Sequence, residues 1–299
     1  MAEVICLGIA VLDHVFQMQE LPQSPVKHFA NDYRAVGGGN AATAAVAVAR
    51  AGGNATFIGR LGNDPNARIL LDELTGYGVD VSHTRLIDGA NSGVSAVLID
   101  ENGERMIVNH ADPKLDFNPS WLQEELSMLD GRSKVAALAD LRWQAGAEAL
   151  LARAKMAGLP AVLDIDLNPE GFTDSVLRCA THALFSEPAL TQYAGTENHQ
   201  VALHVARERL ECWVGFTAGS EGAFWLDGCQ LRHQPGVEIK AVDTLGAGDV
   251  FHGTFALGLA EGLEIPHAMR FASVAAALKC SRFGGRDAIP SRSEIEMTL

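Results

Sequence analysis

The sequence predicts an α/β fold, in which a mostly parallel sheet carries helices on both faces and a small β lid is added. From Lys134 onward, short apolar runs alternate with stretches of helical periodicity, a pattern typical of parallel strands joined by helices. Between residues 83 and 110, apolar and polar residues alternate around Asn102-Gly103, a dipeptide typical of hairpin turns. With 299 residues and 47% hydrophobic content, the chain can bury one large core, so we expect a single domain spanning 1–299.

The first predicted strand is the apolar run from Val4 to Ile9, which suits a strand buried on both faces. Asp13 follows this run by four residues. Ligands of open α/β sheets bind beyond the carboxyl ends of the strands, so Asp13 is placed to bind the hydroxyl groups of a ligand. The alternative for such a residue is an ordinary solvated position in a loop.

The next segments predict part of the lid and a buried helix. Residues 14–36 are polar and contain Lys27. The stretch from Gly37 to Gly53 is alanine-rich in its middle, with almost no polar face, so we expect a buried helix that ends at a C-terminal glycine cap. A strand over 55–59 and a helix that begins after the N-cap Asp64 come next. Residues 14–36 and 83–110 together predict the β lid.

The second half predicts strands over 135–139, 161–165, 183–185 and 212–216, with a helix over 145–157 and a hairpin through Asp227-Gly228. Polar residues stand at or just after the predicted strand ends. They include Arg142, Asp164, Asp166, Glu187 and Thr217. Because the carboxyl ends of parallel strands share one edge of a sheet, we expect these residues on the ligand-binding side.

Composition excludes several classes of partner. The net charge of −14 argues against nucleic acid and against an anionic membrane surface, and an anionic ligand would need a local cluster of positive groups. No apolar run is long enough to cross a membrane. The five cysteines are odd in number and form no Cys-x-x-Cys pair, and the first residues do not read as a signal peptide. We therefore expect a cytoplasmic protein with reduced thiols.

The sequence Asp243–Gly253, DTLGAGDVFHG, lies between a predicted strand over 237–241 and a predicted helix that contains Val250. Small residues at a helix N-terminus let an anion approach unpaired backbone N–H groups, where the helix dipole favours negative charge. Asp249 beside such an anion site suits a base that faces an attacking hydroxyl, as phosphoryl transfer requires. The alternative is a glycine-rich turn with an ordinary Asp. The stretch fits neither a Walker A loop nor a dinucleotide fingerprint.

This stretch resembles the carboxy-terminal signature of the ribokinase-like (PfkB) carbohydrate kinases. The resemblance implies a ribokinase-like fold and an ATP-dependent sugar kinase that uses Mg²⁺. Asp249 would be the catalytic base, and the anion hole would consist of Gly246, Ala247 and Gly248. The sugar would contact Asp13, Gly38, Gly39 and Thr43, and the nucleotide Thr217, Gly219, Gly222 and Ala276.

Four positions depart from the pattern of that family. Thr43 stands where the family commonly has Asn, and Asp166 replaces the Asn of an Asp-x-Asn pattern. The Asn-x-x-Glu pattern near the phosphates reads Ser186 and Ala189, with Glu187 as the nearby carboxylate. Magnesium takes oxygen ligands and keeps several waters, so we expect binding through water that involves Asp164, Asp166 or Glu187.

Further motifs, among them GERMIVNH, ADLRWQ and ALKCSRFGGR, resemble the sulfofructose kinases of bacterial sulfoglycolysis. That resemblance implies phosphorylation of 6-deoxy-6-sulfofructose to its 1-phosphate, with the sulfonate held by Lys27, Asn109 and Arg142. Arg142 could equally form an ion pair at a strand end.

Two alternative functions stay open. One is a kinase of the same family for fructose 6-phosphate or another sugar, and the other is a non-catalytic nucleotide-binding regulator on this fold. Since a lid would leave unpaired strand edges, we expect a homodimer through the lids.

Overall fold

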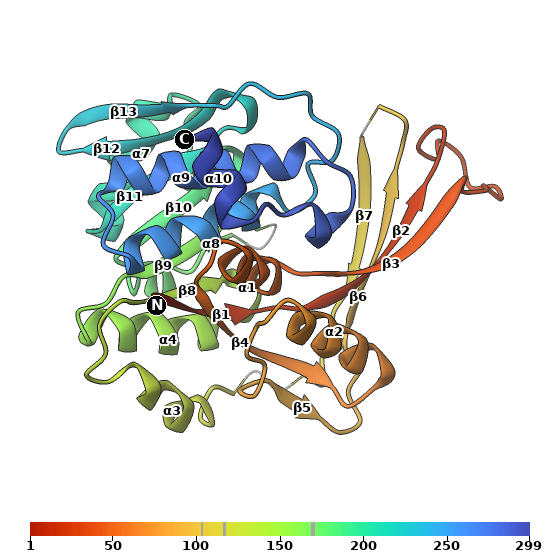
Figure 1. Ribbon diagram of the computed structural model, residues 1–299, viewed down its shortest axis with the longest axis horizontal. Helices are drawn as coiled ribbons and strands as arrows, with labels where there is room; N and C mark the ends of the chain where they lie inside the picture. Colours follow the sequence, from red (N-terminus) through yellow and green to blue (C-terminus); the bar gives the residue numbers. More distant parts are fainter. Residues whose placement is uncertain (103, 116–117, 169–170) are drawn as a thin grey trace.

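The computed structural model describes residues 1–102, 104–115, 118–168 and 171–299. Its main body is a nine-stranded sheet in the order β13-β12-β11-β10-β9-β8-β1-β4-β5, covered by helices on both faces (Figure 1). Neighbouring strands are parallel from β11 to β5, and β12 and β13 are antiparallel. This confirms the predicted fold class. The strands are β1 (Glu3–Gly8), β4 (Asn54–Gly62), β5 (Arg85–Ile87), β8 (Val135–Asp140), β9 (Ala161–Ile165), β10 (His182–Ser186), β11 (Trp213–Thr217), β12 (Gly222–Asp227) and β13 (Gln230–Pro235).

Two separate apolar cores lie on the two faces of this sheet. Successive residues of β1 alternate between them, with Val4 and Cys6 in one core and Ile5 and Leu7 in the other. The first core contains α1, α8 and α9, and the second contains α4, α6 and α7. The helices are α1 (Asn40–Arg50), α2 (Pro65–Gly76), α3 (Leu122–Glu125), α4 (Gln144–Met156), α5 (Asp174–Leu177), α6 (Glu187–Ala194), α7 (His199–Leu210), α8 (Ala247–Ala260), α9 (Ile265–Cys280) and α10 (Arg292–Thr298), with short 3₁₀ turns η1 (Leu126–Leu129), η2 (Leu141–Trp143), η3 (Gly219–Glu221) and η4 (Gly285–Ala288).

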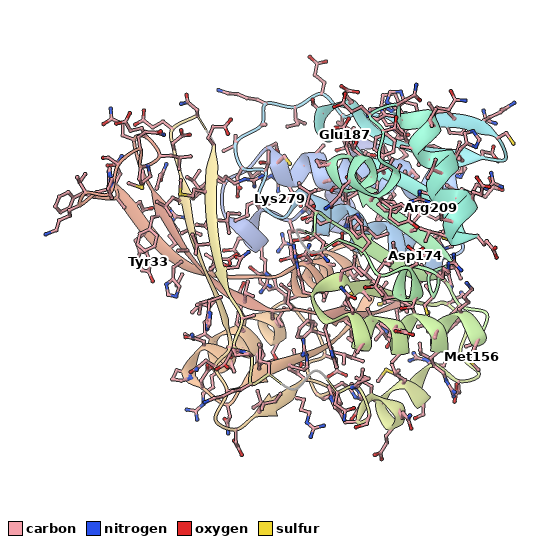
Figure 2. All side chains as sticks on the ribbon, turned by 180° about the vertical axis from the view of Figure 1, so that it is seen from behind. Tyr33, Met156, Asp174, Glu187, Arg209 and Lys279 are labelled. Atoms are coloured by element: carbon pink, nitrogen blue, oxygen red, sulfur yellow. The ribbon has the colours of Figure 1, made fainter. Side chains whose placement is uncertain are left out.

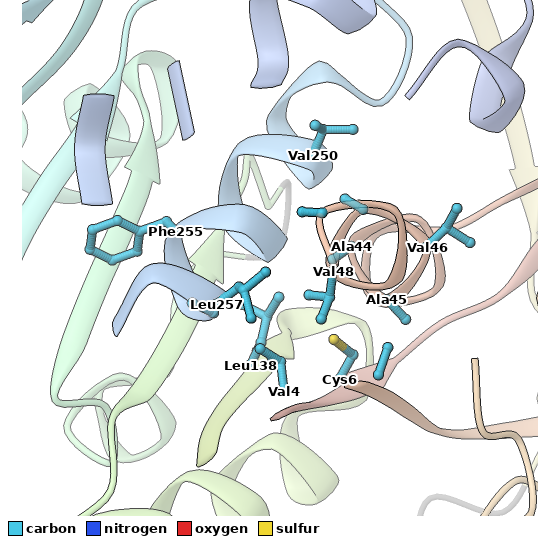
Figure 3. Packing of buried hydrophobic residues seen from close by; sticks show 14 of the residues in the cluster. Val4, Cys6, Ala44, Ala45, Val46, Val48, Leu138, Val250, Phe255 and Leu257 are labelled. Atoms are coloured by element: carbon cyan, nitrogen blue, oxygen red, sulfur yellow. The ribbon is translucent and has the colours of Figure 1, made fainter. Parts of the chain in front are cut away.

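The alanine-rich helix α1 is buried, as its composition predicts. Ala44 and Val48 lie among side chains of α8 and of the neighbouring strands (Figure 3). The approach to α8 is so close that a Cβ atom on Gly253 would stand 2.5 Å from the carbonyl oxygen of Ala44. Small residues on both helices therefore bring the first turn of α8 and the first turn of α1 to the same cavity.

A second, four-stranded sheet stands beside the main body in the order β3-β2-β6-β7 (Figure 1). Its strands are β2 (Val11–Gln17), β3 (Asp32–Gly38), β6 (Gly93–Ile99) and β7 (Arg105–His110). Strands β6 and β7 pair antiparallel, as the hairpin pattern predicts, although Gly103 of the predicted turn lies outside the described residues. Residues 85–87 fall in the range predicted for the lid, but they form β5, which pairs with β4 at the edge of the main sheet.

The predicted strand over 237–241 is wrong. Strand β13 ends at Pro235, and residues 236–246 form a connection that leads to α8. Val237, Ile239 and Ala241 line a cavity, so the alternation reflects a chain that runs along a cavity wall rather than pairing in a sheet. None of the helices in the described residues is long and apolar enough to span a membrane.

Candidate active site

A cavity of about 670 Å³, called here the central cavity, opens at the carboxyl ends of the middle strands of the main sheet. The strand ends contribute Asp164 of β9, Ser186 of β10 and Thr217 of β11. The small sheet forms the facing wall with residues of β2, β6 and β7, including Asp13 and Ser95. This is the position at which open α/β sheets bind ligands.

The N-terminus of α8 forms an anion site in this cavity. Gly246 adopts the left-handed conformation, with φ of 77°, and precedes the first helical residue, Ala247. A Cβ atom on Gly248 would have no neighbour within 4 Å, so the space beside this backbone is open. Amides in the first helical turn lack acceptors within the helix. The predicted anion hole is therefore open enough for a phosphoryl group to reach these amides, and its small residues allow that close approach.

Asp249 lies in the first turn of α8 and lines the same cavity. Burial and the nearby charge of Asp164 together raise the pKa of its carboxyl group to about 7, although His252 acts in the opposite direction. A base with a pKa near the working pH is suited to accept a proton from an attacking hydroxyl.

Asp164 and His252 form a buried pair behind this base. Nδ1 of His252 lies 3.1 Å from Oδ1 of Asp164, although the angle is not that of a hydrogen bond and both ring nitrogens lack a hydrogen-bond partner in the described residues. Asn40, at the start of α1, donates from Nδ2 to the other oxygen of Asp164 at 3.3 Å. The histidine was not predicted as a site residue, since a lone His in a helix carries no specific pattern.

Side chains and backbone are closely packed at the end of the cavity that contains Asp13. Asp13 is buried, and a Cβ atom on Gly38 would stand 1.9 Å from its Oδ2 atom, so a larger residue there would displace this carboxylate. Arg286 of η4 donates to the carbonyl oxygen of Gly38 at 2.8 Å and to the hydroxyl of Thr43 at 3.4 Å. Gly39 and Thr43 also line the cavity. Arg286 comes from a distant loop and was not predicted.

Asn109 of β7 and Arg142 of η2 both line the central cavity. Within the described residues, the guanidinium of Arg142 has no acidic partner within ion-pair distance. Lys27 is exposed in the connection between β2 and β3 and lies outside the cavity lining. The structure therefore brings two of the three predicted sulfonate contacts together and leaves the third apart.

The buried carboxylate of Asp140 holds Arg142 in this position. It accepts hydrogen bonds from the amides of Ile9 at 2.9 Å, Ala41 at 3.2 Å and Arg142 at 2.9 Å. Burial raises the pKa of Asp140 to about 6, although these amide bonds act in the opposite direction.

Arginine side chains gather at the central cavity although the net charge of the chain is −14. The arginines that line it are Arg60, Arg105, Arg142 and Arg286.

A second cavity of about 530 Å³, called here the side cavity, contains the residues predicted to bind the nucleotide. These are Thr217, Gly219, Gly222 and Ala276. The two cavities share four lining residues, which are Thr217, Thr244, Ala247 and Gly248. The start of α8 therefore lies where the two cavities meet.

The predicted metal ligands are occupied by protein partners. Ser186 donates to Asp166 at 3.0 Å, and Glu187 pairs with His199 at 2.7 Å, outside the central cavity. In the described residues, no group of three His, Cys, Asp or Glu side chains could hold a metal directly. Asp164 and Asp166 still line the cavity near the anion site, which fits magnesium held by one or two carboxylates, waters and substrate phosphates.

An aspartate with a raised pKa, an open helix N-terminus and two adjoining cavities suit a phosphotransferase with an alcohol acceptor. The profile of the pfkB family of carbohydrate kinases matches residues 1–292, and the chain belongs to this family of ATP-dependent sugar kinases, which use ATP with Mg²⁺.

Relatives match over nearly the whole chain. Ribokinase of Bacillus subtilis is 26% identical over 304 residues, covering 100% of both chains. Fructosamine kinase FrlD of the same organism is 30% identical over 251 residues, which is 83% of this chain and 84% of the relative. A crystal structure from Agrobacterium tumefaciens, provisionally named a ribokinase, is 38% identical with a TM-score of 0.90, covering 99% of this chain and 96% of that one.

Proposed function

We propose that this kinase transfers the γ-phosphoryl group of ATP to O1 of 6-deoxy-6-sulfofructose. The observation that carries the proposal is Arg142, a cation without an acidic partner among the described residues, which lines the central cavity together with Asn109. A sulfonate is a monoanion with three acceptor oxygens. Arginine supplies planar paired donors and asparagine a neutral donor, so the two side chains suit such a group.

In this proposal, different residues of the central cavity bind the sugar, accept its proton and stabilise the transferred phosphoryl group. Asp13 and the backbone around Gly38 bind sugar hydroxyl groups and orient O1 toward Asp249. The carboxylate of Asp249 accepts the proton of O1 as the hydroxyl attacks, and the amides at the start of α8 stabilise the charge of the transferred group. ATP would supply the phosphoryl group, and Mg²⁺ would neutralise part of its charge. Asp164 and Asp166 would hold the metal through water.

The small sheet acts as a lid in this proposal. It forms one wall of the central cavity and contributes Asn109 from β7. Excluding water from the cavity prevents hydrolysis of ATP in place of transfer to the sugar. The whole chain would then work as one kinase domain, with the lid opening and closing over the site.

We also propose a homodimer in which the small sheets of two copies meet. All six residues of β7 are exposed, and Met106 and Val108 alternate with residues that line the cavity, so they face the other way. Val26 and Phe29, which flank Lys27, are 66% and 81% exposed. Exposed apolar groups of this kind favour a partner surface. In such a dimer, Lys27 would be able to contact the sulfonate, although it lies outside the cavity lining in the single chain.

A cytoplasmic location accompanies this proposal. The five cysteines are free thiols, and Cys6 is buried. Free thiols are typical of proteins from reducing compartments.

The alternative substrates belong to the same family. Relatives are named ribokinase and fructosamine kinase, so ribose, fructosamine and fructose 6-phosphate are the competitors. A panel that measures kcat/KM for these sugars, for fructose and for sulfofructose tests the assignment. Sulfofructose is expected to give the highest value. Equal efficiency with fructose 6-phosphate would overturn the sulfonate assignment and leave the general sugar kinase.

A further inference from the structure

Lys279 is a buried lysine that the chemistry described so far does not use. It lies in the last turn of α9, and only 1% of its side chain is exposed. Figure 2 labels it in the main body, whereas Tyr33 lies on the separate small sheet. An ammonium group is costly to bury unless oxygen acceptors surround it, so the partners of Nζ are expected to be specific.

Those partners belong to one residue, Asp243. Nζ of Lys279 donates to the carbonyl oxygen of Asp243 at 3.0 Å and forms an ion pair with its Oδ2 atom at 2.9 Å. The hydrogen bond holds the backbone of Asp243, and the ion pair holds its side chain. Asp243 is the first residue of the DTLGAGD stretch and stands three residues before Gly246.

Asp243 in turn holds the approach to the anion site. Its Oδ1 atom accepts from the amide of Leu245 at 2.9 Å, next to Gly246. The amides of Val242 and Asp243 donate to the carbonyl oxygen of Cys280, at 2.8 and 3.1 Å. The whole segment before α8 is therefore attached to the end of α9 through Asp243 and its partners.

The same carboxylate reaches toward the sugar end of the cavity. Its Oδ2 atom accepts from the amide of Gly285 at 3.4 Å. The next residue, Arg286, binds the carbonyl oxygen of Gly38 and the hydroxyl of Thr43. One ammonium–carboxylate pair thus connects the segment that carries the anion hole with the loop that borders Asp13.

We propose that Lys279 is a positioning residue for phosphoryl transfer. Its ammonium group serves as a fixed internal cation that holds Asp243, and through it sets the amides of Gly246 to Gly248 relative to the sugar. Lys279 touches neither substrate and acts only through Asp243. The inference rests on phosphoryl transfer at the start of α8 and is independent of which sugar is the acceptor.

The test compares two variants by kcat and by the KM values of ATP and sugar. The acceptor is the sugar on which the wild type is most active in the panel above, so failure of the sulfofructose assignment leaves this test intact. Misplacement of catalytic groups by about 1 Å can lower a rate by about 10². We expect Lys279→Met to lower kcat by about 10- to 100-fold while the KM of the sugar changes by less than about threefold.

Chemical rescue separates positioning from mere loss of packing. Lys279→Ala leaves a cavity beside the two oxygens of Asp243, and added methylammonium is expected to restore kcat at least about fivefold, since it returns a cation to the same acceptors. Lys279→Met fills the cavity and is expected to show no rescue. Lys155→Ala is the control, because Lys155 is an exposed lysine that donates to the carbonyl oxygens of Arg178 and Ala180 and lies outside both cavities.

The proposal fails if folded Lys279→Met keeps kcat within about twofold of the wild type, or if methylammonium does not restore Lys279→Ala. If the single variants do not fold, the double variant Lys279→Met with Asp243→Asn removes both buried charges at once. We expect that variant to fold and to have a low kcat. Full activity of the double variant would show that the pair serves only stability, and would overturn the inference.

Discussion

Nδ1 of His252 lies 3.1 Å from Oδ1 of Asp164. His252 itself follows Asp249, the proposed base, by three residues in α8. Burial by itself lowers the pKa of His252, but the charges of Asp164 and Asp249 outweigh it, so the pKa is raised. A protonated imidazole at this place offsets part of the carboxylate charge in the cavity. The protonation state of Asp249 therefore depends on a cluster of charges rather than on Asp249 alone.

The first prediction concerns pH. The pKa of Asp249 is raised to about 7, so the carboxyl is protonated below this value and cannot accept the proton of the sugar hydroxyl. We expect kcat/KM to fall by about tenfold for each pH unit below about pH 7 and to level off above it. A profile measured from pH 5.5 to 8.5 checks this, and a flat profile over that range would contradict it.

The second prediction concerns the role of Asp249 as base. Asp249→Asn preserves the shape of the side chain but removes its ability to accept a proton. We expect turnover to fall by about 10²–10⁴ while the affinity for ATP stays within a few fold. Single-turnover assays with labelled ATP, together with ATP binding by calorimetry, measure the two effects. Nearly normal turnover in the folded variant would remove Asp249 from the catalytic role.

The third prediction concerns the stability of the same variant. The folded-state pKa of Asp249 is raised, so the ionised carboxylate destabilises the fold increasingly as pH rises from about 4 to about 7. That rise corresponds to at most about 4 kcal/mol, and partial exposure to solvent reduces it. We expect Asp249→Asn to increase the free energy of unfolding by about 1–3 kcal/mol at pH 8 and by little at pH 4. Urea unfolding at the two pH values measures this, and equal gains at both would refute it.

The fourth prediction concerns substrate selection. Arg142→Ala removes the planar donors from the sulfonate, and loss of a hydrogen bond between charged groups costs about 1.5–3 kcal/mol. We expect kcat/KM for sulfofructose to fall at least about tenfold, while that for fructose, which has no anion, changes far less. Arg153→Ala is the matched control, since Arg153 pairs with Asp130 on the surface and lies outside both cavities. Equal losses for both sugars would argue against a sulfonate contact.

The fifth prediction concerns assembly. Two copies that pair through their small sheets would bury Val108, which is 63% exposed in the single chain. We expect a dimer by light scattering at assay concentrations, and we expect Val108→Asp to weaken it because a carboxylate would be buried without a partner. Met156→Asp is the control, since Met156 is 81% exposed on α4 of the main body. A monomeric wild type would rule the proposed dimer out.

Local patterns in the sequence were sufficient to predict most helices and strands and to propose a reaction centre. The Asp64-Pro65 pair predicts the start of α2, where Asp64 accepts from the amide of Ala67 at 2.8 Å. The alanine-rich run predicts the buried helix α1. Asp249 and the glycines before it were recognisable because an anion site at a helix N-terminus needs only neighbouring residues.

Tertiary structure alone decided which distant residues join this centre. Arg286, Lys279 and Asp140 stand far from their partners in sequence, and no local periodicity marks them. The predicted strand over 237–241 failed for a related reason, since its alternation reflects a cavity wall. Lys27, grouped with Asn109 and Arg142 by resemblance, lies apart from them in the single chain. Secondary structure follows from short-range periodicity, whereas a buried charge acquires its partner only when packing brings separate elements together.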